Sequence, residues 1–402
     1  MTARRTRAPL RALAEPAPAP APRLEVVERL APGTGPAGGR LIHARDNLAA
    51  LHALAGEGVV VDLVYLDPPY MAGSDRVLAA PGDPLAYRDT WPGGRGEYLE
   101  MLRARVLAIR GLLARTANLV LHLDWHAVHY AKVLLDELLG VGNFRNEIIW
   151  RRANAHNDPA RFGVITDTLL LYGAGPRPYW ADVHVPYTPE YIKSHWRRRD
   201  DRGPYRLVPL DAPRHGDGGQ LVYAWRGKLP AATRTWAVVR ETMEALEREG
   251  RIAYTAAGTP NLKRYLDESP GLRAQNLWDD IPPVNPMARE RLGYPTQKPV
   301  ALLERIVSAT CPPDGLVLDP FHGSGTTAEA AERLGRRWIG VDSNPDAVRM
   351  ARDRLLALHG KPGRGPQAAR YDDCEACGRV TRRVRHAKAP PLQVRPFTVE
   401  RV

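Results

Sequence analysis

The sequence has few cysteines and no long apolar run, and each absence excludes a class of protein. Only three of its 402 residues are cysteine (Cys311, Cys374 and Cys377), too few for a secreted scaffold built on disulfides. No uninterrupted apolar stretch reaches the roughly 20 residues needed to span a bilayer. The first residues are basic and then rich in Ala and Pro, without the apolar segment of a secretory signal. We therefore expect a cytoplasmic protein in a reducing compartment.

What the sequence does contain is enough apolar residues for a large core and an excess of positive charge. Hydrophobic residues make up 44% and charged residues 25%, so most of the chain should fold. The length of 402 residues predicts two or three units, or one large α/β body with an insertion. The formal net charge of +12 favours a polyanionic partner, such as nucleic acid or an acidic membrane surface.

The positive charge is concentrated in three segments. Residues 1–40 carry a net +4, residues 360–402 a net +6 and residues 193–240 a net +7. The first is predicted to be a disordered Ala/Pro-rich tail and the second a basic tail. In the third, aromatic residues alternate with the cations, which fits a nucleic-acid surface as well as a solvated face over core aromatics. The candidate nucleic-acid contacts are Lys193, Trp196, Arg197, Arg198, Arg199, Arg226 and Lys228.

Strands and helices alternate on both sides of an irregular middle segment. The apolar periodicity predicts strands at 41–43, 59–66, 118–123, 147–150, 168–172, 316–318 and 338–341, and helices at 47–54, 97–115, 126–139, 326–334, after 299 and up to 358. Strands alternating with helices predict an α/β fold, with a mostly parallel sheet and helices on both faces. Residues 175–290 are rich in Pro, Gly, charge and Trp, which is typical of an inserted second unit.

A glycine-containing turn, LDPFHGSGTT at residues 318–327, follows a predicted strand and opens a predicted helix. Glycines let a ligand approach the backbone closely, and a helix N-terminus offers free N–H groups to an anion. The next strand ends in Asp342, where nucleotide-binding α/β folds place an acid that bonds ribose hydroxyls. The combination predicts a ligand with a nucleoside part. Asp342 could also be a helix N-cap before Pro345, and the two roles could coexist.

A second motif, Asp67-Pro68-Pro69-Tyr70, ends the predicted strand at 59–66. The prolines lack a backbone donor, so nearby carbonyls stay open. The carboxylate and such a carbonyl can accept two hydrogen bonds from an exocyclic amino group, while the tyrosine ring stacks on the base that carries it. A strand-ending turn with a surface Asp would give the same pattern. In one parallel sheet, however, both motifs would reach the same edge, where the ligand crevice forms.

In these motifs the sequence resembles the S-adenosylmethionine-dependent DNA amino-methyltransferases, in particular the β-type permuted group with DPPY before FxGxG. Residues 67–70 (DPPY) here precede residues 321–325 (FHGSG). Residues 294–299 (YPTQKP) resemble the segment before the family's cofactor strand. Residues 39–47 (GRLIHARDN) resemble its strand ending in Gly-Asp, with Arg45 in place of the glycine and Asp46 kept.

The resemblance implies a Rossmann-like class I methyltransferase fold with an inserted target-recognition domain. The predicted parts are a disordered tail at 1–40, a catalytic half at 41–175, the target-recognition insertion at 176–290, a cofactor-binding half at 291–359 and a basic tail at 360–402.

The resemblance further implies transfer of a methyl group from S-adenosylmethionine to the N6 amino group of an adenine flipped out of double-stranded DNA. Methylation of cytosine N4 needs the same geometry, although the cytosine enzymes more often carry Ser in place of Asp67. An RNA methyltransferase and a non-catalytic DNA-binding protein are further alternatives. Besides double-stranded DNA, the expected partners are a cognate restriction endonuclease and a second copy in a homodimer, with no membrane partner.

The resemblance also assigns the site residues. The catalytic residues are Asp67, Pro68, Pro69 and Tyr70. The cofactor contacts are Asp46 for adenine, Asp342 for ribose, Thr296 and Lys298 for the carboxylate, and Asp319, Phe321, Gly323, Ser324, Gly325 and Thr326 around the rest. Direct transfer needs no covalent intermediate, so Cys311 is expected to be a buried apolar residue. No metal is expected, because Cys374 and Cys377 form only half of a four-ligand zinc site.

Overall fold

The computed structural model describes residues 22–30, 38–78, 85–154, 158, 160–360, 362–374, 379–391 and 394–402. The chain divides into two compact units. Unit 1 comprises Met1–Ala181, Gln275–Lys361 and Pro391–Val402, and unit 2 comprises Asp182–Ala274 and Pro362–Pro390. Unit 2 therefore takes up most of the irregular middle segment and also a stretch that the sequence placed in the C-terminal tail. Within the described ranges, no helix has the length and apolarity needed to cross a membrane.

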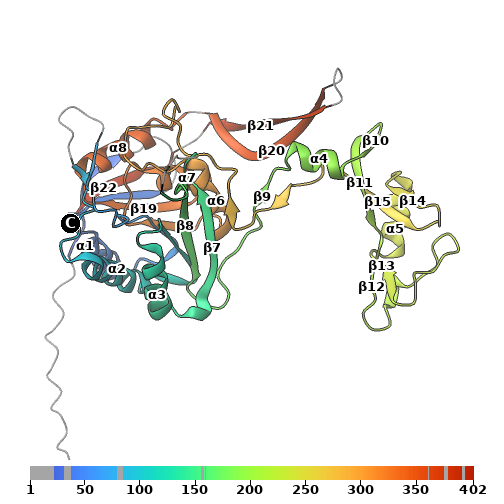
Figure 1. Ribbon diagram of the computed structural model, residues 1–402, viewed down its shortest axis with the longest axis horizontal. Helices are drawn as coiled ribbons and strands as arrows, with labels where there is room; N and C mark the ends of the chain where they lie inside the picture. Colours follow the sequence, from blue (N-terminus) through green and yellow to red (C-terminus); the bar gives the residue numbers. More distant parts are fainter. Residues whose placement is uncertain are drawn as a thin grey trace, which may run out of the picture. The chain divides into compact units, whose positions relative to one another are not determined.

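Unit 1 is built on a ten-stranded sheet in the order β1-β22-β2-β19-β18-β3-β6-β8-β7-β17 (Figure 1). Its strands are β1 (Glu25–Leu30), β2 (Gly39–His43), β3 (Val61–Leu66), β6 (Leu113–Leu123), β7 (Phe144–Arg151), β8 (Thr166–Gly173), β17 (Leu277–Trp278), β18 (Leu316–Asp319), β19 (Arg337–Asp342) and β22 (Phe397–Arg401). Strand β8 is antiparallel to both neighbours and β1 is antiparallel to β22. The remaining neighbours pair in parallel.

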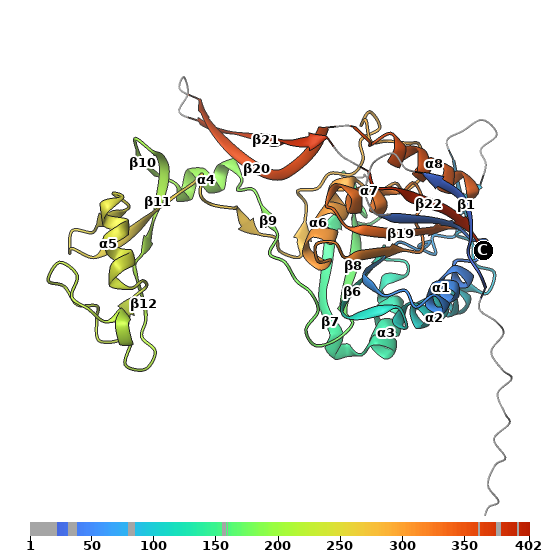
Figure 2. The ribbon, with the colours of Figure 1, turned by 180° about the vertical axis from the view of Figure 1, so that it is seen from behind.

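Helices cover both faces of this sheet (Figures 1 and 2). On one face lie α1 (Asn47–Gly56), α2 (Gly94–Arg110) and α3 (Val128–Leu139), and on the other α6 (Val300–Thr310), α7 (Thr326–Arg333) and α8 (Pro345–Leu356). Each layer buries its own apolar cluster against the sheet, and both clusters are mainly Leu, Val, Ile and Ala. Short elements complete the unit: β4 (Arg76–Val77), β5 (Leu85–Tyr87) and the 3-10 turn Val141–Asn143. The arrangement confirms the predicted Rossmann-like α/β fold.

The strand register brings the predicted motifs to one edge of the sheet. Val64 of β3 pairs with Leu318 of β18, and Asp319 pairs with Gly340 of β19. Because these strands run parallel, the residues that follow them emerge at the same carboxyl edge. The turns that begin at Asp67 and Pro320 are therefore neighbours, as the sequence predicted.

Unit 2 is a smaller, mainly antiparallel unit. Its four-stranded sheet has the order β10-β11-β15-β14, from β10 (Arg198–Asp200), β11 (Gly203–Pro209), β15 (Pro260–Tyr265) and β14 (Ile252–Tyr254). Two-stranded ribbons join β12 (Asp211–Pro213) to β13 (Arg234–Trp236), β9 (His184–Val185) to β16 (Leu272–Arg273), and β20 (Pro362–Cys374) to β21 (Arg379–Pro391). The helices are α4 (Pro189–His195) and α5 (Arg240–Arg248), with a 3-10 turn at Gly219–Leu221.

The predictions for the two chain ends were wrong where the structure describes them. Strand β1 lies in the segment predicted as a disordered tail, and β22 lies in the predicted basic tail, yet both belong to the main sheet. The charge of Glu400, which is only 3% exposed, is compensated by Arg40 at 2.9 Å. The prolines at 1–21 and Cys377 lie outside the described residues, as does the side chain of Cys374.

The predicted helix at 97–115 was too long. Helix α2 ends at Arg110, and Gly111 forms its C-cap by donating its N–H to the carbonyl of Ala108. Leu113 continues the helical spacing of apolar residues, but it already belongs to β6.

Candidate active site

A cavity of about 510 Å³ opens at the carboxyl edge of the unit 1 sheet. Among the residues that line it are Asp46, Asp67, Pro68, Pro69, Tyr70, Thr296, Lys298, Asp319, Phe321, Gly323, Ser324, Thr326 and Asp342. The structure thus brings together the four predicted catalytic residues and every predicted cofactor contact except Gly325. That glycine instead forms the N-cap of α7 with a φ of 85°, and a Cβ there would lie 2.8 Å from the side chain of Ala351.

The glycine turn is held by two aspartates. The backbone N–H of Gly323 donates to Asp342 Oδ2 at 2.7 Å, and that of Asn344 donates to Oδ1 at 2.8 Å. Asp319 accepts from the N–H of Phe321 at 3.0 Å and from Thr327 Oγ1 at 2.5 Å. Burial raises the pKa of Asp342, and the two backbone N–H groups offset this only in part. The N-cap of α8 is Asn344, so Asp342 is not the cap that the sequence allowed.

Asp67 is held on both carboxylate oxygens. The hydroxyl of Tyr70 donates to Oδ1 at 2.8 Å, and Lys298 Nζ donates to Oδ2 at 2.5 Å. Lys298 is 7% exposed, and its ammonium lies 5.2 Å from the centroid of the Tyr70 ring. The pKa of Tyr70 is raised well above its usual value by burial and by the charge of Asp67, so its hydroxyl remains a donor. The sequence placed Lys298 at the cofactor carboxylate, whereas here it pairs with Asp67.

Asp46 lines the cavity but already has two partners. Its Oδ1 accepts from the N–H of Leu48, which caps α1, and from Arg105 Nη2 at 2.6 Å. Arg105 also donates to Asn47 Oδ1 at 2.8 Å, and Asn47 Nδ2 donates to the carbonyl of Pro320 at 2.7 Å. Asn47 and Arg105 thus connect α1 and α2 to the glycine turn. Neither residue was predicted as part of the site, although Asn47 ends the GRLIHARDN segment.

A second cavity, of about 560 Å³, shares part of its wall with the first. Both are lined by Tyr70, Tyr87, Tyr294, Thr296, Gln297 and Lys298. The second is also lined by Asp89, Asp124, His126, Trp150, Arg152 and Asp167. The Tyr70–Lys298 pair therefore stands where the two cavities meet.

A buried polar chain lies behind Tyr70. The Tyr65 hydroxyl contacts His122 Nδ1 at 2.8 Å, and His122 Nε2 contacts Asp167 Oδ2 at 3.2 Å. Arg152 Nε lies 2.8 Å from the other oxygen of Asp167. The His122 ring lies 6.0 Å from the ring of Tyr70. The His122 ring thus joins this polar chain to the surroundings of the Tyr70 ring.

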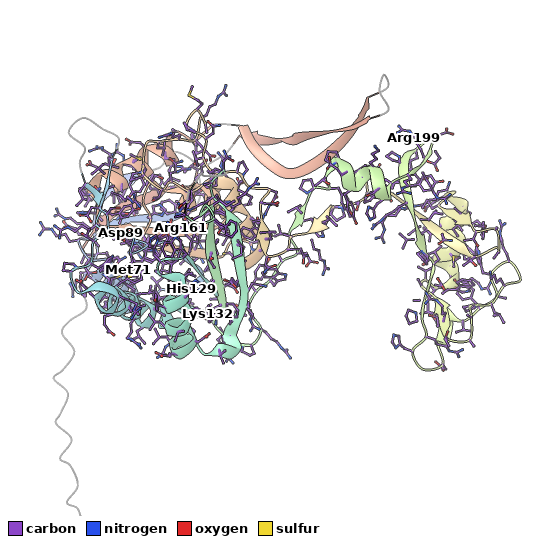
Figure 3. The ribbon with its side chains drawn as sticks, viewed as in Figure 1. Met71, Asp89, His129, Lys132, Arg161 and Arg199 are labelled. Carbon is purple, nitrogen blue, oxygen red and sulfur yellow. The ribbon has the colours of Figure 1, made fainter. Side chains whose placement is uncertain are left out.

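The backbone after Tyr70 is held in an unusual conformation. Met71 has a φ of 62°, and its N–H donates to Asp89 Oδ1 at 2.7 Å (both residues are labelled in Figure 3). The N–H of Ala72 donates to Oδ2 of the same carboxylate at 3.0 Å. Asp89 is 1% exposed, so a buried carboxylate holds the backbone that follows the DPPY motif. No motif in the sequence around Asp89 indicated this role.

The predicted DNA contacts all lie in unit 2, in different environments. Lys193, Arg197, Arg198 and Arg199 are exposed. Arg226 is exposed and paired with Glu247, whereas Lys228 donates to the carbonyl of Ala257 at 2.7 Å. Trp196 is only 5% exposed and packs with Tyr187, Ile192 and Leu266, so its ring belongs to the core of unit 2 and is not presented to solvent. Within the described part of the chain, no group of three or more His, Cys, Asp or Glu could hold a metal ion.

The family described as DNA methylase matches residues 61–353. Type II methyltransferase M.EcaI of Enterobacter cloacae is 32% identical over 314 residues, which cover 77% of this chain and 68% of that protein. The StyLTI Mod subunit of Salmonella typhimurium, a type III restriction-modification enzyme, is 27% identical over 323 residues, covering 72% of this chain and 49% of that protein.

Among solved structures, the complex of M1.HpyAVI with SAM is 17% identical and has a TM-score of 0.44. The match covers 79% of this chain and 98% of that chain. The family match spans most of the chain and contains both cavity motifs, and the relative M.EcaI is similar over two thirds of its length. This chain belongs to the DNA methylase family.

Proposed function

We propose that this protein transfers the methyl group of S-adenosylmethionine to the N6 amino group of an adenine extruded from double-stranded DNA. The observation that carries the proposal is the pair of adjoining cavities that share a wall at Tyr70 and Lys298, with Asp67 beside them. One cavity would hold the methyl donor and the other the target base. The order of the motifs, with DPPY before the glycine turn, favours the β-type group.

The first cavity fits the donor. Its glycine turn leaves little room for a larger residue, since a Cβ at Gly323 would lie 3.0 Å from the ring of Tyr294. Each oxygen of Asp342 accepts one backbone N–H, and a carboxylate oxygen has a further lone pair that can accept a ribose hydroxyl. When bound, S-adenosylmethionine supplies an electrophilic methyl group on a positively charged sulfur.

Asp67 and the Pro68 carbonyl would hold the amino group that accepts the methyl. An exocyclic amine is a weak nucleophile because its lone pair is delocalised into the base. Acceptors for its two hydrogens draw it towards a tetrahedral geometry and stabilise the positive charge that develops on nitrogen. Tyr70 and Lys298 occupy one lone pair on each Asp67 oxygen, and about two remain for the amine.

The target base would enter the second cavity. Extrusion of a base costs a few kcal/mol, and stacking on aromatic side chains offsets part of that cost. Tyr70, Tyr87 and Trp150 line this cavity. Asp67 in place of Ser favours adenine over cytosine, whose N4 amine would need the same acceptors.

Unit 2 would recognise the target sequence, with Lys193, Arg197 and Arg198 as exposed phosphate contacts. The names of the similar proteins, a type II methyltransferase and a Mod subunit, favour a cognate restriction endonuclease as a partner. We extend the proposal to a homodimer, which light scattering of the purified protein would test, and to a cytoplasmic location, where the DNA substrate lies.

The decisive experiment measures incorporation of a labelled methyl group into unmethylated genomic DNA, followed by long-read sequencing to identify the modified base and its sequence context. We expect N6-methyladenine at one recurring sequence. N4-methylcytosine would replace the adenine assignment, and absence of incorporation into any DNA would overturn the proposed function.

A variant pair tests the role of Asp67. Asp67→Ala should lose methyl transfer by about a thousandfold, since it removes the acceptor of the amine, yet keep donor binding in calorimetry. Asp353→Ala is the matched control, because Asp353 is an exposed residue of α8 that pairs with Arg352 at 3.1 Å and lines neither cavity, so turnover should be unchanged. Normal turnover of the Asp67 variant would remove this residue from the mechanism.

A further inference from the structure

An exposed aromatic side chain, Trp125, stands beside the second cavity. Its indole is 45% exposed, while its neighbours in the chain, Asp124 and His126, both line that cavity. Strands β3 and β6 are parallel, with Leu66 opposite Leu121, so Trp125 emerges at the same sheet edge as Asp67.

The indole rests on a fixed support. Its ring stacks on that of His126, with centroids 3.9 Å apart and an angle of 28° between planes. His126 Nδ1 in turn lies 2.9 Å from both oxygens of Asp124, which is 5% exposed. The buried carboxylate of Asp124 thus holds His126, and His126 supports the exposed indole of Trp125. A large aromatic ring held in this way is pre-organised for stacking on a flat partner.

Two further residues extend this surface. The guanidinium of Arg161 lies 5.6 Å from the centroid of the Trp125 ring (Arg161 is labelled in Figure 3). Arg161 is also paired with Asp158 at 3.0 Å, but its side chain is 61% exposed. The next residue, Phe162, is 98% exposed, so its ring contributes nothing to the core. An exposed ring beside a cation, followed in the chain by a second exposed ring, matches the chemistry of a nucleic-acid strand, in which bases alternate with phosphates.

We propose that Trp125 and Phe162 stack on the bases that flank the extruded adenine, while Arg161 binds a backbone phosphate. The proposal rests on the proposed function, because it takes the second cavity as the place of the target base. Removal of the target base from the duplex leaves its neighbours without a stacking partner, and the two rings would replace it. This surface would stabilise the extruded state and would not touch the methyl donor.

The test uses duplexes that carry 2-aminopurine at the methylation site, once sequencing has mapped it. Its fluorescence rises when the base leaves the stack. The full-length double variant W125A/F162A should lower the population of extruded base about tenfold, in line with the stacking strength of an aromatic residue. Trp180→Ala is the matched control, since Trp180 is 56% exposed elsewhere in unit 1, and it should leave the signal unchanged.

A second duplex separates stacking from a general loss of structure. Placing the target adenine opposite an abasic site removes its Watson–Crick partner and lowers the cost of extrusion, so the double variant should methylate this duplex within about twofold of the wild type. Donor binding by calorimetry should also be unchanged. An undiminished fluorescence signal, or a defect that persists on the abasic duplex, would overturn the proposal. If the wild type methylates no DNA, the proposed function itself fails, so the two failures are distinguishable.

Discussion

Aromatic residues line cavities in unit 1, whereas in unit 2 they form the core and arginine side chains cover them. In unit 1 the core is mainly aliphatic, and tyrosines such as Tyr70, Tyr87 and Tyr294 line cavities at the sheet edge. In unit 2 the aromatic residues are the core, and arginines cover them: the Arg206 guanidinium lies 4.9 Å from the centroid of the Trp196 ring, and others lie over further rings. Alternating aromatic and basic residues in a sequence can therefore indicate a cation-covered aromatic core as well as a binding surface.

The largest effect is expected from a substitution that tests the structural role of aromatic residues in unit 2. Trp196→Ala should lower the free energy of unfolding by about 3–5 kcal/mol, because it removes a buried indole from a small core. Urea unfolding followed by circular dichroism measures this change. Trp180→Ala, at an exposed position, should change the stability by less than about 0.5 kcal/mol. Equal stability of the two variants would mean that Trp196 is available to DNA after all.

A second variant tests what the cation of Lys298 contributes to the site in unit 1. Lys298→Met removes the cation from Asp67 at nearly constant volume, so the turnover rate should fall by about a hundredfold with little change in donor affinity. Single-turnover kinetics and calorimetry measure the two quantities separately. Lys132→Met provides the control at an ion pair that lines neither cavity. Weakened donor binding at normal turnover would instead place Lys298 at the donor carboxylate, as the sequence suggested.

A third variant tests whether basic side chains of unit 2 bind DNA. Arg197→Ala combined with Arg198→Ala should weaken DNA binding and reduce the slope of log K against log salt by about 1.8, which is about 0.9 for each lost phosphate contact. Filter binding at several salt concentrations gives the slope. Arg305→Ala is the control, since Arg305 is held by Asp280 in unit 1. An unchanged slope would place the DNA surface on other residues.

The smallest effect is expected at Cys311, which is buried in the aliphatic core of unit 1. Burial raises the pKa of its thiol to about 12. In a C374S/C377S background, the native protein should therefore not react with a thiol reagent at pH 8, whereas the unfolded chain should react once. The Cys311→Ala variant should retain methyl-transfer activity. Because the folded thiol holds its proton up to a higher pH than the unfolded one, its contribution to stability should fall as the pH rises above about 9.

The sequence predicted the parts of the fold that depend on local signals. The β-branched residues before Asp67 and the glycines after Asp319 predicted where two strands end. Parallel pairing of these strands then predicted that the turns after them lie at one edge of the sheet. The strands at the chain ends were missed because the pairing of Val26 with Glu400 joins residues far apart in sequence, within segments whose composition favours disorder. Non-local pairing of this kind leaves little trace in local periodicity.

Within the site, the sequence identified the residues but not their partners. Lys298 and Asp67 were both predicted, yet nothing in either motif showed that they form an ion pair with each other. Asp89 was beyond reach, because a single buried polar residue between apolar elements looks the same whether it caps a turn, packs or supports a site. Side-chain partnerships across separate elements depend on tertiary packing.

Lys298 joins the two halves of the site mechanically. Its side chain holds Asp67 at 2.5 Å, and its backbone carbonyl accepts from Thr326 Oγ1 in the first turn of α7, at 3.2 Å. A ligand that shifts the glycine turn must then also disturb the carboxylate that faces the other ligand. Thermodynamic linkage makes such an influence reciprocal, so whatever factor the donor imposes on the affinity for an extruded base, that base must impose on the affinity for the donor.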